Sequence, residues 1–418
     1  MSLSPASANR LLIALGLVLI LSWGSLYYSL AVLALPLRTE LGFSELTVFG
    51  AFTLGVLVSG LAAPAVGRWI DRSGGRGPLA LGSILAALAF VLLATANGLV
   101  VYFLGWLIAG AAMALCLYDP VFVVIHQVLP DRFRRSVTVL TLFGGFASTV
   151  FWPLSHWLVE IAGWREALLM FAAFQLLIAL PVHLFMVPPK PGVGDSSAAA
   201  EALSMHAQSA PAPPEKIELA WLSLAFASAM GVFGALSLFL IDALESRGFD
   251  RADAVWLAAA IGPMQVVGRL VEWRFANRSR AVTVGAVSLS LLLVSTLLLN
   301  LISPYWVLGL VFAAFYGIAN GLLTVVRSTV PVEIFGPANV GATLGHLARP
   351  AFVVKALMPA IFAGLLAAGV QMSVALWTLA AFAALAIVAY WRLFVARERS
   401  NQNRRQRRMQ LDRQALEP

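Results

Sequence analysis

The chain has 418 residues, of which 60% are hydrophobic and 11% charged, and its formal net charge is +8. Soluble globular domains carry about 25% charged residues, so this composition excludes a water-soluble protein of this size and indicates lipid as the main solvent. The positive charge does not indicate nucleic-acid binding, because the basic residues fall between apolar runs and in the C-terminal tail. The single cysteine, Cys116, excludes a disulfide within the chain.

Apolar runs long enough to cross a bilayer recur along the whole chain. A spanning helix needs about 20 such residues. We predict twelve spans, at residues 11–35, 46–69, 78–97, 99–128, 136–160, 166–187, 218–243, 252–275, 281–300, 303–329, 338–368 and 371–395. The first run exceeds the core of a signal peptide, about 7–15 residues, so we interpret it as a span.

The spans divide into two groups of six. Residues 188–217 are rich in Pro, Ala and Ser and have no apolar periodicity, which indicates a flexible linker. We therefore predict an N-terminal six-helix lobe (1–187), a cytoplasmic linker (188–217), a C-terminal six-helix lobe (218–396) and a basic cytoplasmic tail (397–418). We expect the tail to lack stable secondary structure, either against anionic lipid headgroups or in solvent.

The distribution of Lys and Arg predicts the orientation. Of the 28 basic residues, 22 fall on the side of the N-terminus, four on the other side, and two, Arg349 and Lys355, inside the eleventh span. Loops rich in Lys and Arg stay in the cytoplasm. We expect both termini in the cytoplasm and the protein in a membrane, such as a bacterial cytoplasmic (inner) membrane.

The two halves are related by an internal repeat. The run Gly67-Arg68-Trp69-Ile70-Asp71 reappears as Gly268-Arg269-Leu270-Val271-Glu272, an offset of 201 residues. Pro130 and Gly144 recur as Pro331 and Gly345 at the same offset. Three landmarks at one offset indicate two pseudo-symmetric lobes.

A short charged turn joins the second and third spans. It reads Gly67-Arg68-Trp69-Ile70-Asp71-Arg72-Ser73-Gly74-Gly75-Arg76, one acid among three arginines. In type and spacing it resembles the loop Gly-x-x-x-Asp-Arg-x-Gly-x-Arg of the major facilitator superfamily, and the resemblance extends over nearly the whole chain. We expect a gate motif made of Gly67, Asp71, Arg72, Gly75 and Arg76.

The resemblance implies an all-α membrane protein with twelve transmembrane helices in two pseudo-symmetric six-helix lobes. In that family the cargo site lies between the lobes near mid-membrane, and the first and fourth helices of each half line it. The resemblance further implies a secondary transporter that works by alternating access, without a cofactor or an ATP site.

Few ionisable residues lie at membrane depth, and each is a functional candidate because burying a charge there costs about 2.5–3.5 kcal/mol. Asp119 lies in the fourth span, and His126 follows seven residues later on nearly the same helical face. One interpretation is that Asp119 carries a proton and His126 relays it. The other is an interhelical hydrogen bond that holds the lobe together.

Arg349 and Lys355 lie in the eleventh span, about 120° apart around a helix. Each needs a partner at that depth. Either at least one binds a substrate anion, or the partner is Asp119 or a main-chain carbonyl.

Aromatic and polar residues mark two further spans. Trp23, Tyr27 and Tyr28 lie in the middle of the first span, and Tyr316 and Asn320 share a face of the tenth. They suit the wall of a small-molecule site, and they equally suit ordinary helix packing. We interpret Arg269, the repeat of Arg68, as a residue at the end of a cytoplasmic loop.

Within the family, the chain most resembles the monocarboxylate and oxalate–formate exchanger branch, which has cations in helices eight and eleven that meet a carboxylate. The eleventh-helix cations are present, but Met264 stands where the eighth-helix arginine is expected. The drug–proton antiporter branch has an arginine in helix four where this chain has Trp106, and it has helix-five glycines that are absent here.

We therefore expect a transporter of a small organic anion, for which a monocarboxylate is one candidate and proton coupling one mechanism. We expect it to act as a monomer and to bind no nucleic acid. The alternatives are proton-driven efflux of drugs or other xenobiotics and, in another class, a membrane sensor that does not transport. No metal-ligand cluster, nucleophile–base set or phosphate loop indicates an enzyme.

Overall fold

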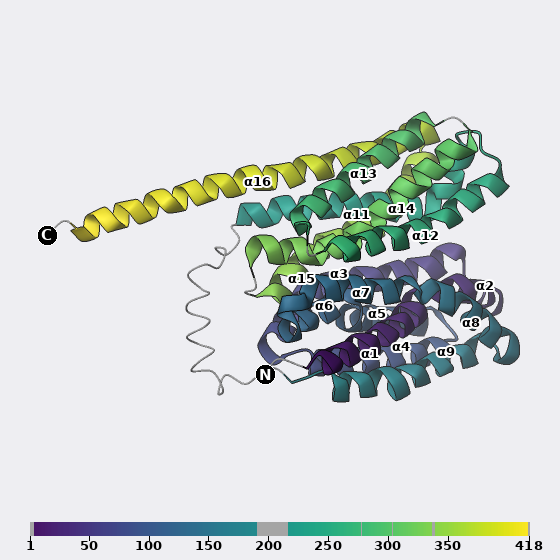
Figure 1. Cartoon of the computed structure of the whole chain (residues 1–418). Coiled ribbons are helices and arrows are strands. Elements are labelled where there is room, and N and C mark those ends of the chain that lie inside the picture. Colours follow the sequence, from purple (N-terminus) through teal and green to yellow (C-terminus); the bar gives the residue numbers. More distant parts are fainter. Residues whose placement is uncertain (1–3, 190–215, 277, 303, 337–338, 417–418) are drawn as a thin grey trace.

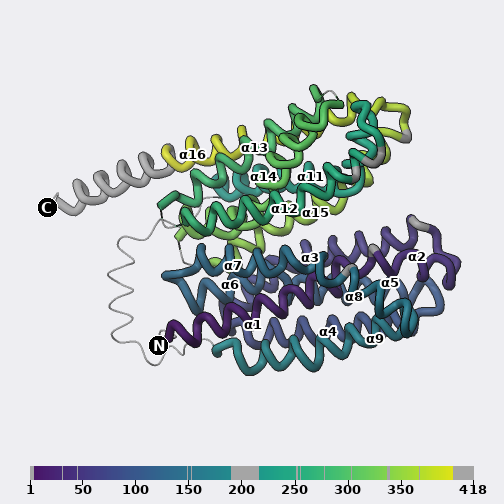
Figure 2. The backbone as a smooth tube through the Cα atoms, turned by 45° about the vertical axis from the view of Figure 1, so that its right-hand side comes forward, coloured from purple at the N-terminus to yellow at the C-terminus, as the bar shows by residue number. Residues whose placement is uncertain are grey.

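The computed structural model describes residues 4–189, 216–276, 278–302, 304–336 and 339–416, and in these ranges the chain is helical without strands. The helices form two bundles side by side, with the start of α1 and the end of α16 at the same end of the molecule (Figures 1 and 2). The all-α, two-lobed fold expected from the sequence is confirmed.

The first lobe holds the six spans predicted before the linker. Its elements are α1 (Pro5–Trp23), η1 (Gly24–Tyr28), α2 (Leu30–Leu41), α3 (Glu45–Ser73), α4 (Arg76–Ala94), α5 (Leu99–Cys116), α6 (Tyr118–Val128), η2 (Pro130–Arg132), α7 (Phe133–Gly145), α8 (Ala147–Ala162), α9 (Trp164–Phe174), η3 (Gln175–Ala179) and η4 (Val182–Met186).

The second lobe is built from longer, less interrupted helices. Its elements are α11 (Lys216–Glu245), α12 (Arg251–Phe275), α13 (Ala281–Leu301), α14 (Trp306–Phe335), α15 (Val340–Ala367) and α16 (Met372–Leu416). Eleven segments of the described chain are long and apolar enough to cross a membrane. The helix α12 occupies the place of the eighth predicted span and is not among those eleven.

Two of the predicted boundaries are corrected. The tail does not lack secondary structure, since α16 continues as a helix to Leu416; Glu, Gln and Arg are good helix formers, and they fill this segment. The tenth span was expected to end at residue 329, whereas α14 continues to Phe335. Most of the linker predicted at 188–217 lies outside the described residues.

Each lobe has its own apolar core. One buried cluster is formed by α11 to α16, and two others mainly by α1 to α9. The lobes meet where α3 packs along α15 and where α7 packs against α12 and α14. This arrangement leaves a space between the lobes that polar side chains can line.

Candidate functional site

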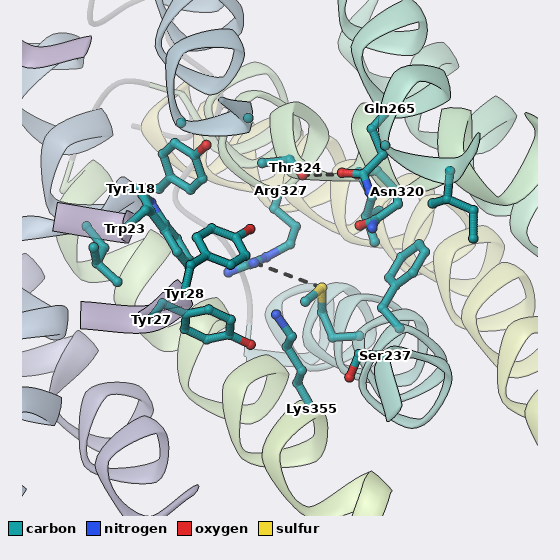
Figure 3. A pocket seen from close by; sticks show the side chains of 18 of the residues that line it. Trp23, Tyr27, Tyr28, Tyr118, Ser237, Gln265, Asn320, Thr324, Arg327 and Lys355 are labelled. Atoms are coloured by element: carbon teal, nitrogen blue, oxygen red, sulfur yellow. Dashed lines mark hydrogen bonds between the residues drawn. The ribbon is translucent and has the colours of Figure 1, made fainter. Parts of the chain in front are cut away.

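A cavity of about 960 Å³ lies between the two lobes. The first lobe lines it with residues of α1, η1, α3, α5, α6, α7 and α8, and the second with residues of α11, α12, α14 and α15. The first and fourth spans of each half, expected from the family resemblance, are all present in the lining. Figure 3 shows the aromatic residues of the first lobe across from the polar residues of the second.

Aromatic side chains form the wall contributed by the first lobe. Trp23 lies edge-on to Tyr27, with ring centroids 5.3 Å apart, and its ring centroid is 5.0 Å from that of Tyr118. Tyr27 and Tyr28 are likewise edge-on, 5.4 Å apart. All four residues line the cavity and are half-buried, so their rings are not enclosed in the core of the lobe.

A π-helical turn brings these rings together. In η1 the amide of Ser29 donates to the carbonyl of Gly24, five residues back, at 2.9 Å. The wider turn lets residues five apart share a face, so Trp23 and Tyr28 come within 6.3 Å. A regular helix would place only Trp23 and Tyr27 on one face, which is all that the sequence pattern indicated.

An ion pair crosses the cavity between the lobes. Arg327 Nη2 of α14 lies 3.6 Å from Asp119 Oδ1 of α6, and its guanidinium carbon lies 5.1 Å from the ring centroid of Phe352. Asp119 follows the interruption between α5 and α6 at Leu117, next to Pro120, whose ring cannot continue the hydrogen-bond ladder. The carboxylate thus belongs to the first turn of α6.

Lys355 of α15 lines the same cavity without an acidic partner within the described residues. Its Nζ lies 5.5 Å from the ring centroid of Tyr27, across the lobe boundary. Figure 3 shows the side chains of Lys355 and Arg327 extending from the second lobe toward the tyrosines of the first. Cation–π contact is a weaker substitute for a counter-ion at this depth.

Arg269 is a third cation in the lining, and its interpretation as a loop-end residue is corrected. Its side chain is buried, and its Nη1 donates to the carbonyl of Thr141 in α7 at 3.0 Å. Arg68, its repeat equivalent, is exposed. The repeat predicted the position of Arg269 along its helix. It did not predict the burial of Arg269, because α7 packs over the second copy and leaves the first copy exposed at Arg68.

The remaining polar lining comes from the second lobe. Tyr316, Asn320 and Gln265 line the cavity, and Thr324 Oγ1 donates to the main-chain carbonyl of Asn320 at 3.0 Å. Tyr316 is itself buried against Phe233, with ring centroids 5.2 Å apart. The predicted residues Trp23, Tyr27, Tyr28, Tyr316, Asn320, Asp119 and Lys355 are therefore brought together around one cavity.

Two predicted site residues lie elsewhere. Arg349 is exposed and does not line the cavity, because it points away from the face of α15 that carries Lys355. His126 is also outside the lining, and its ring packs edge-on against that of Phe133, with ring centroids 5.2 Å apart. We therefore withdraw the substrate role for Arg349 and the proton relay through His126.

The gate motif lies at one end of the lobe interface, hereafter the motif end. Asp71 accepts hydrogen bonds from the amides of Gly341 and Ala342, at 2.9 and 2.7 Å. These amides lie in the first turn of α15, where they have no acceptor within the helix and where the helix dipole also favours a carboxylate. Asp71 therefore joins the gate motif of the first lobe to the second lobe.

Two other motif residues, Gly75 and Arg76, make contacts within the first lobe. A Cβ added to Gly75 would lie 1.9 Å from Val124 Cγ2, so the close approach of that helix requires glycine. Arg76 Nε donates to the carbonyl of Val187 at 2.9 Å. Arg72 is exposed.

The second copy of the motif also joins the lobes. Glu272 of α12 is 3% exposed and lies 2.6 Å from Arg134 Nε of α7. Thr138 donates a hydrogen bond to the same carboxylate, and Arg134 donates to the carbonyls of Ala276 and Ser279. Both copies therefore make polar contacts between lobes at the motif end.

Sequence reasoning missed Arg327, Arg269, Tyr118 and the contact of Glu272 with Arg134. His126 and Arg327 are 201 residues apart, so the internal repeat makes them equivalent positions of the fourth and tenth spans. Each of these positions holds a polar side chain. That signal could have identified Arg327 as a membrane-depth cation. No cluster of three or more metal-binding side chains occurs in the part of the chain that the structure describes.

Comparison with known proteins gives a family match and several distant relatives. The family model of the Major Facilitator Superfamily matches residues 15–294. Monocarboxylate transporter 13 of Bos taurus is 27% identical over 303 residues, which cover 70% of this chain and 67% of that protein. An uncharacterized 38 kDa protein of Thermoproteus tenax is 31% identical over 41% of this chain, and the match spans only 45% of that relative's length.

Solved structures resemble the whole fold. The human organic anion transporter MFSD10 matches with a TM-score of 0.70 and 20% identity, over 94% of this chain and all of that one. The fucose:proton symporter of E. coli matches with a TM-score of 0.67 and 14% identity, over 92% of this chain and 98% of that one. At these identities the likeness concerns the fold alone.

Proposed function

Since this chain belongs to the Major Facilitator Superfamily of membrane transporters, we propose that its cargo is a small organic anion that binds in the cavity between the lobes. The observation that carries the proposal is the charge of the lining. Among the described residues of the lining, Arg269, Arg327 and Lys355 are cationic and Asp119 alone is acidic.

The distribution of partners decides where the anion binds. Asp119 compensates Arg327, and Arg269 is held by a carbonyl, whereas Lys355 faces only the ring of Tyr27. An uncompensated ammonium is costly at membrane depth, so the empty cavity favours a ligand that supplies the missing negative charge. We assign Lys355 as the first contact of the anion and Arg327, its neighbour in the lining, as the second.

The relatives support the same cargo class. Monocarboxylate transporter 13 of Bos taurus is named for such a cargo. The solved structures do not bear on the cargo, since an organic anion transporter and sugar symporters share the fold to a similar degree. Met264 stands where the monocarboxylate branch has an arginine in helix eight. In this chain Arg327 of α14 supplies a positive charge to the same cavity instead. A monocarboxylate is the simplest anion of this class.

Alternating access accounts for the contacts at the motif end. With Asp71 and Glu272 both engaged, the lobes are joined at that end, which we assign to the cytoplasm on the distribution of Lys and Arg. The described arrangement is then an outward-facing state, and both termini lie in the cytoplasm. We place the protein in a cytoplasmic (inner) membrane.

Proton coupling follows from the pair of Asp119 and Arg327. A cargo carboxylate that binds Arg327 competes with Asp119, and a displaced carboxylate in a dry site is stabilised by taking up a proton. The other charged and titratable groups that line the cavity are Arg269, Arg327, Lys355, Tyr27, Tyr28, Tyr118 and Tyr316. Anion and proton would then move together.

Thermal stabilisation of the purified protein tests the proposal. Sodium lactate, pyruvate and benzoate are titrated against wild type, Lys355→Gln, Arg327→Gln and Arg349→Gln, the last being a matched loss of charge outside the cavity. We expect stabilisation by at least one anion, weakened about tenfold or more in the first two variants and unchanged in the third. Equal affinity in all four proteins, or stabilisation only by cationic drugs, would favour the drug-efflux alternative instead.

A further inference from the structure

We propose that the cargo carries an aromatic ring next to its anionic group, as in an aromatic carboxylate. This inference rests on the proposed anion site and adds the chemical class of the rest of the molecule. It is carried by the position of the aromatic rings relative to the cations, and the size of the cavity permits it.

Each of the two cations assigned to the anion lies against a ring of the lining. Lys355 Nζ is 5.5 Å from the centroid of Tyr27, and the guanidinium carbon of Arg327 is 5.1 Å from that of Phe352. A carboxylate that binds either cation therefore lies near one of these rings. In an aromatic carboxylate the ring is attached directly to the carboxylate. The carboxylate can therefore bind the cation while the ring packs against the neighbouring aromatic side chain.

The ring surface beyond Tyr27 is continuous and partly open. Trp23, Tyr27, Tyr28 and Tyr118 contact one another edge-on or tilted, at centroid distances of 5.0 to 6.3 Å. They are half-buried and turned toward the cavity (Figure 3), unlike Tyr102 and Phe171, which are fully buried in the core of the same lobe. Edge-to-face rings leave sites for a further ring in the same arrangement.

The opposite wall also contains aromatic rings. Phe233 and Tyr316 of the second lobe line the cavity, with centroids 5.2 Å apart. Both rings are only 4% exposed, so the open aromatic surface of the cavity lies mainly on the first lobe. A cavity of about 960 Å³ can hold an aromatic carboxylate, since pockets of roughly 300–1,000 Å³ take drug-sized ligands. Benzoate, like a three-carbon acid, would fill only part of this volume, so the size of the cavity permits an aromatic acid, and a larger one than benzoate, while the rings and cations carry the inference.

Three matched ligands separate the ring from the charge. Benzoate has both, cyclohexanecarboxylate keeps the charge and the size without the π system, and benzamide keeps the ring without the charge. Affinities are measured by thermal stabilisation of full-length wild type, Tyr27→Leu, Tyr27→Phe and Trp157→Leu. Trp157 is an exposed aromatic residue outside the cavity and serves as the control.

Wild type should bind benzoate roughly two- to tenfold more tightly than cyclohexanecarboxylate. Tyr27→Leu should abolish that difference while cyclohexanecarboxylate still binds, and Tyr27→Phe and Trp157→Leu should keep it. If Tyr27→Leu does not fold, the ligand comparison in wild type decides. Equal binding of the two acids overturns the aromatic class and leaves the anion site standing, whereas equal binding of benzamide and benzoate overturns the anion site itself.

Discussion

The two copies of the gate motif occupy the same place in the two halves and join the lobes by different chemistry. Asp71 accepts from the main-chain amides of Gly341 and Ala342, whereas Glu272 binds the side chains of Arg134 and Thr138. A main-chain contact needs close helices, and a side-chain contact does not. The copies should therefore tolerate different substitutions.

The glycines show the same difference. A Cβ added to Gly67 would lie 1.9 Å from the carbonyl oxygen of Gly341, whereas one added to Gly268 would lie 3.0 Å from that of Ile318. The first copy thus requires glycine on both helices to bring Asp71 to α15. In the second copy Gly268 packs against α14 of its own lobe, and the contact between lobes is made by the long side chain of Arg134.

The largest effect should come from breaking the second copy. Arg134→Gln leaves the buried carboxylate of Glu272 without its cation, and loss of one partner of a buried pair costs about 3–5 kcal/mol. We expect a marked fall in the midpoint of thermal unfolding. Arg134→Gln/Glu272→Gln should recover part of it, and Arg132→Gln, at an exposed neighbour, should change little. A double variant no more stable than the single one would contradict a charge pair.

The next largest effect should come from Asp71→Asn. An amide can accept one of the two hydrogen bonds but directs its NH₂ group at the other amide, and hydrogen bonds to charged groups contribute about 1.5–3 kcal/mol. We expect the motif end to open in a fraction of molecules. Electron–electron distance measurements between labels at Ser73→Cys and Arg278→Cys, in a Cys116→Ala background, would show a new, longer distance.

That variant should still reach the membrane in normal amounts, because Asp71 is not in the core of either lobe. An unchanged distance distribution would mean that the Asp71 contact does not hold the lobes together.

A smaller effect separates the glycines of the two copies. Gly67→Ala must push α3 and α15 apart, so we expect the same longer distance to appear. Gly268→Ala needs a shift of only a few tenths of an ångström and should be milder. Gly364→Ala, on α15 with open space around it, should have no effect. Equal responses of Gly67→Ala and Gly268→Ala would remove the distinction between the copies.

The smallest effect on folding, with a specific effect on coupling, should come from Asp119→Asn. The repeat places Asn320 at the equivalent position of the second half, so this substitution makes the two halves alike. The variant leaves Arg327 without its carboxylate, but this pair is longer than that of Arg134 and Glu272, 3.6 Å against 2.6 Å, and borders the cavity. We therefore expect only a small fall in the midpoint of thermal unfolding, with anion exchange retained and accumulation driven by a pH gradient lost. Gradient-driven uptake that persists in the variant would assign Asp119 a structural role only.

Sequence reasoning predicted the fold well, because apolar length and the repeat are properties of whole segments. The family resemblance implied that the first and fourth helices of each half line the cavity, and these are among the lining helices. The sequence also named Asp119, Lys355, Tyr27, Tyr28 and Tyr316, which lie around the cavity, but not Tyr118. It could not decide which face of α15 is turned inward. Arg349 and Lys355 lie about 120° apart, so only one of them can face a cavity on one side, and packing against α3 determines which.

The cations that were missed have local causes. Arg327 was placed near a loop because the tenth span was ended at residue 329, but α14 continues to Phe335 and so carries Arg327 deeper. Tyr28 joins Trp23 only through the π-helical turn, which no apolar period indicates. The contact of Glu272 with Arg134 joins residues 138 apart in sequence and depends on how the lobes dock.

The claim that the cargo is an anion held by Lys355 is tested most directly by uptake of labelled benzoate into proteoliposomes with an alkaline interior. Benzoic acid also crosses lipid unaided, so the initial rate in protein-free liposomes is subtracted. We expect equal protein-dependent initial rates in wild type and Arg349→Gln, and a loss of at least nine-tenths of that rate in Lys355→Gln. Equal rates in all three proteins, or no uptake above protein-free liposomes in wild type while a cationic drug is moved, would contradict the account.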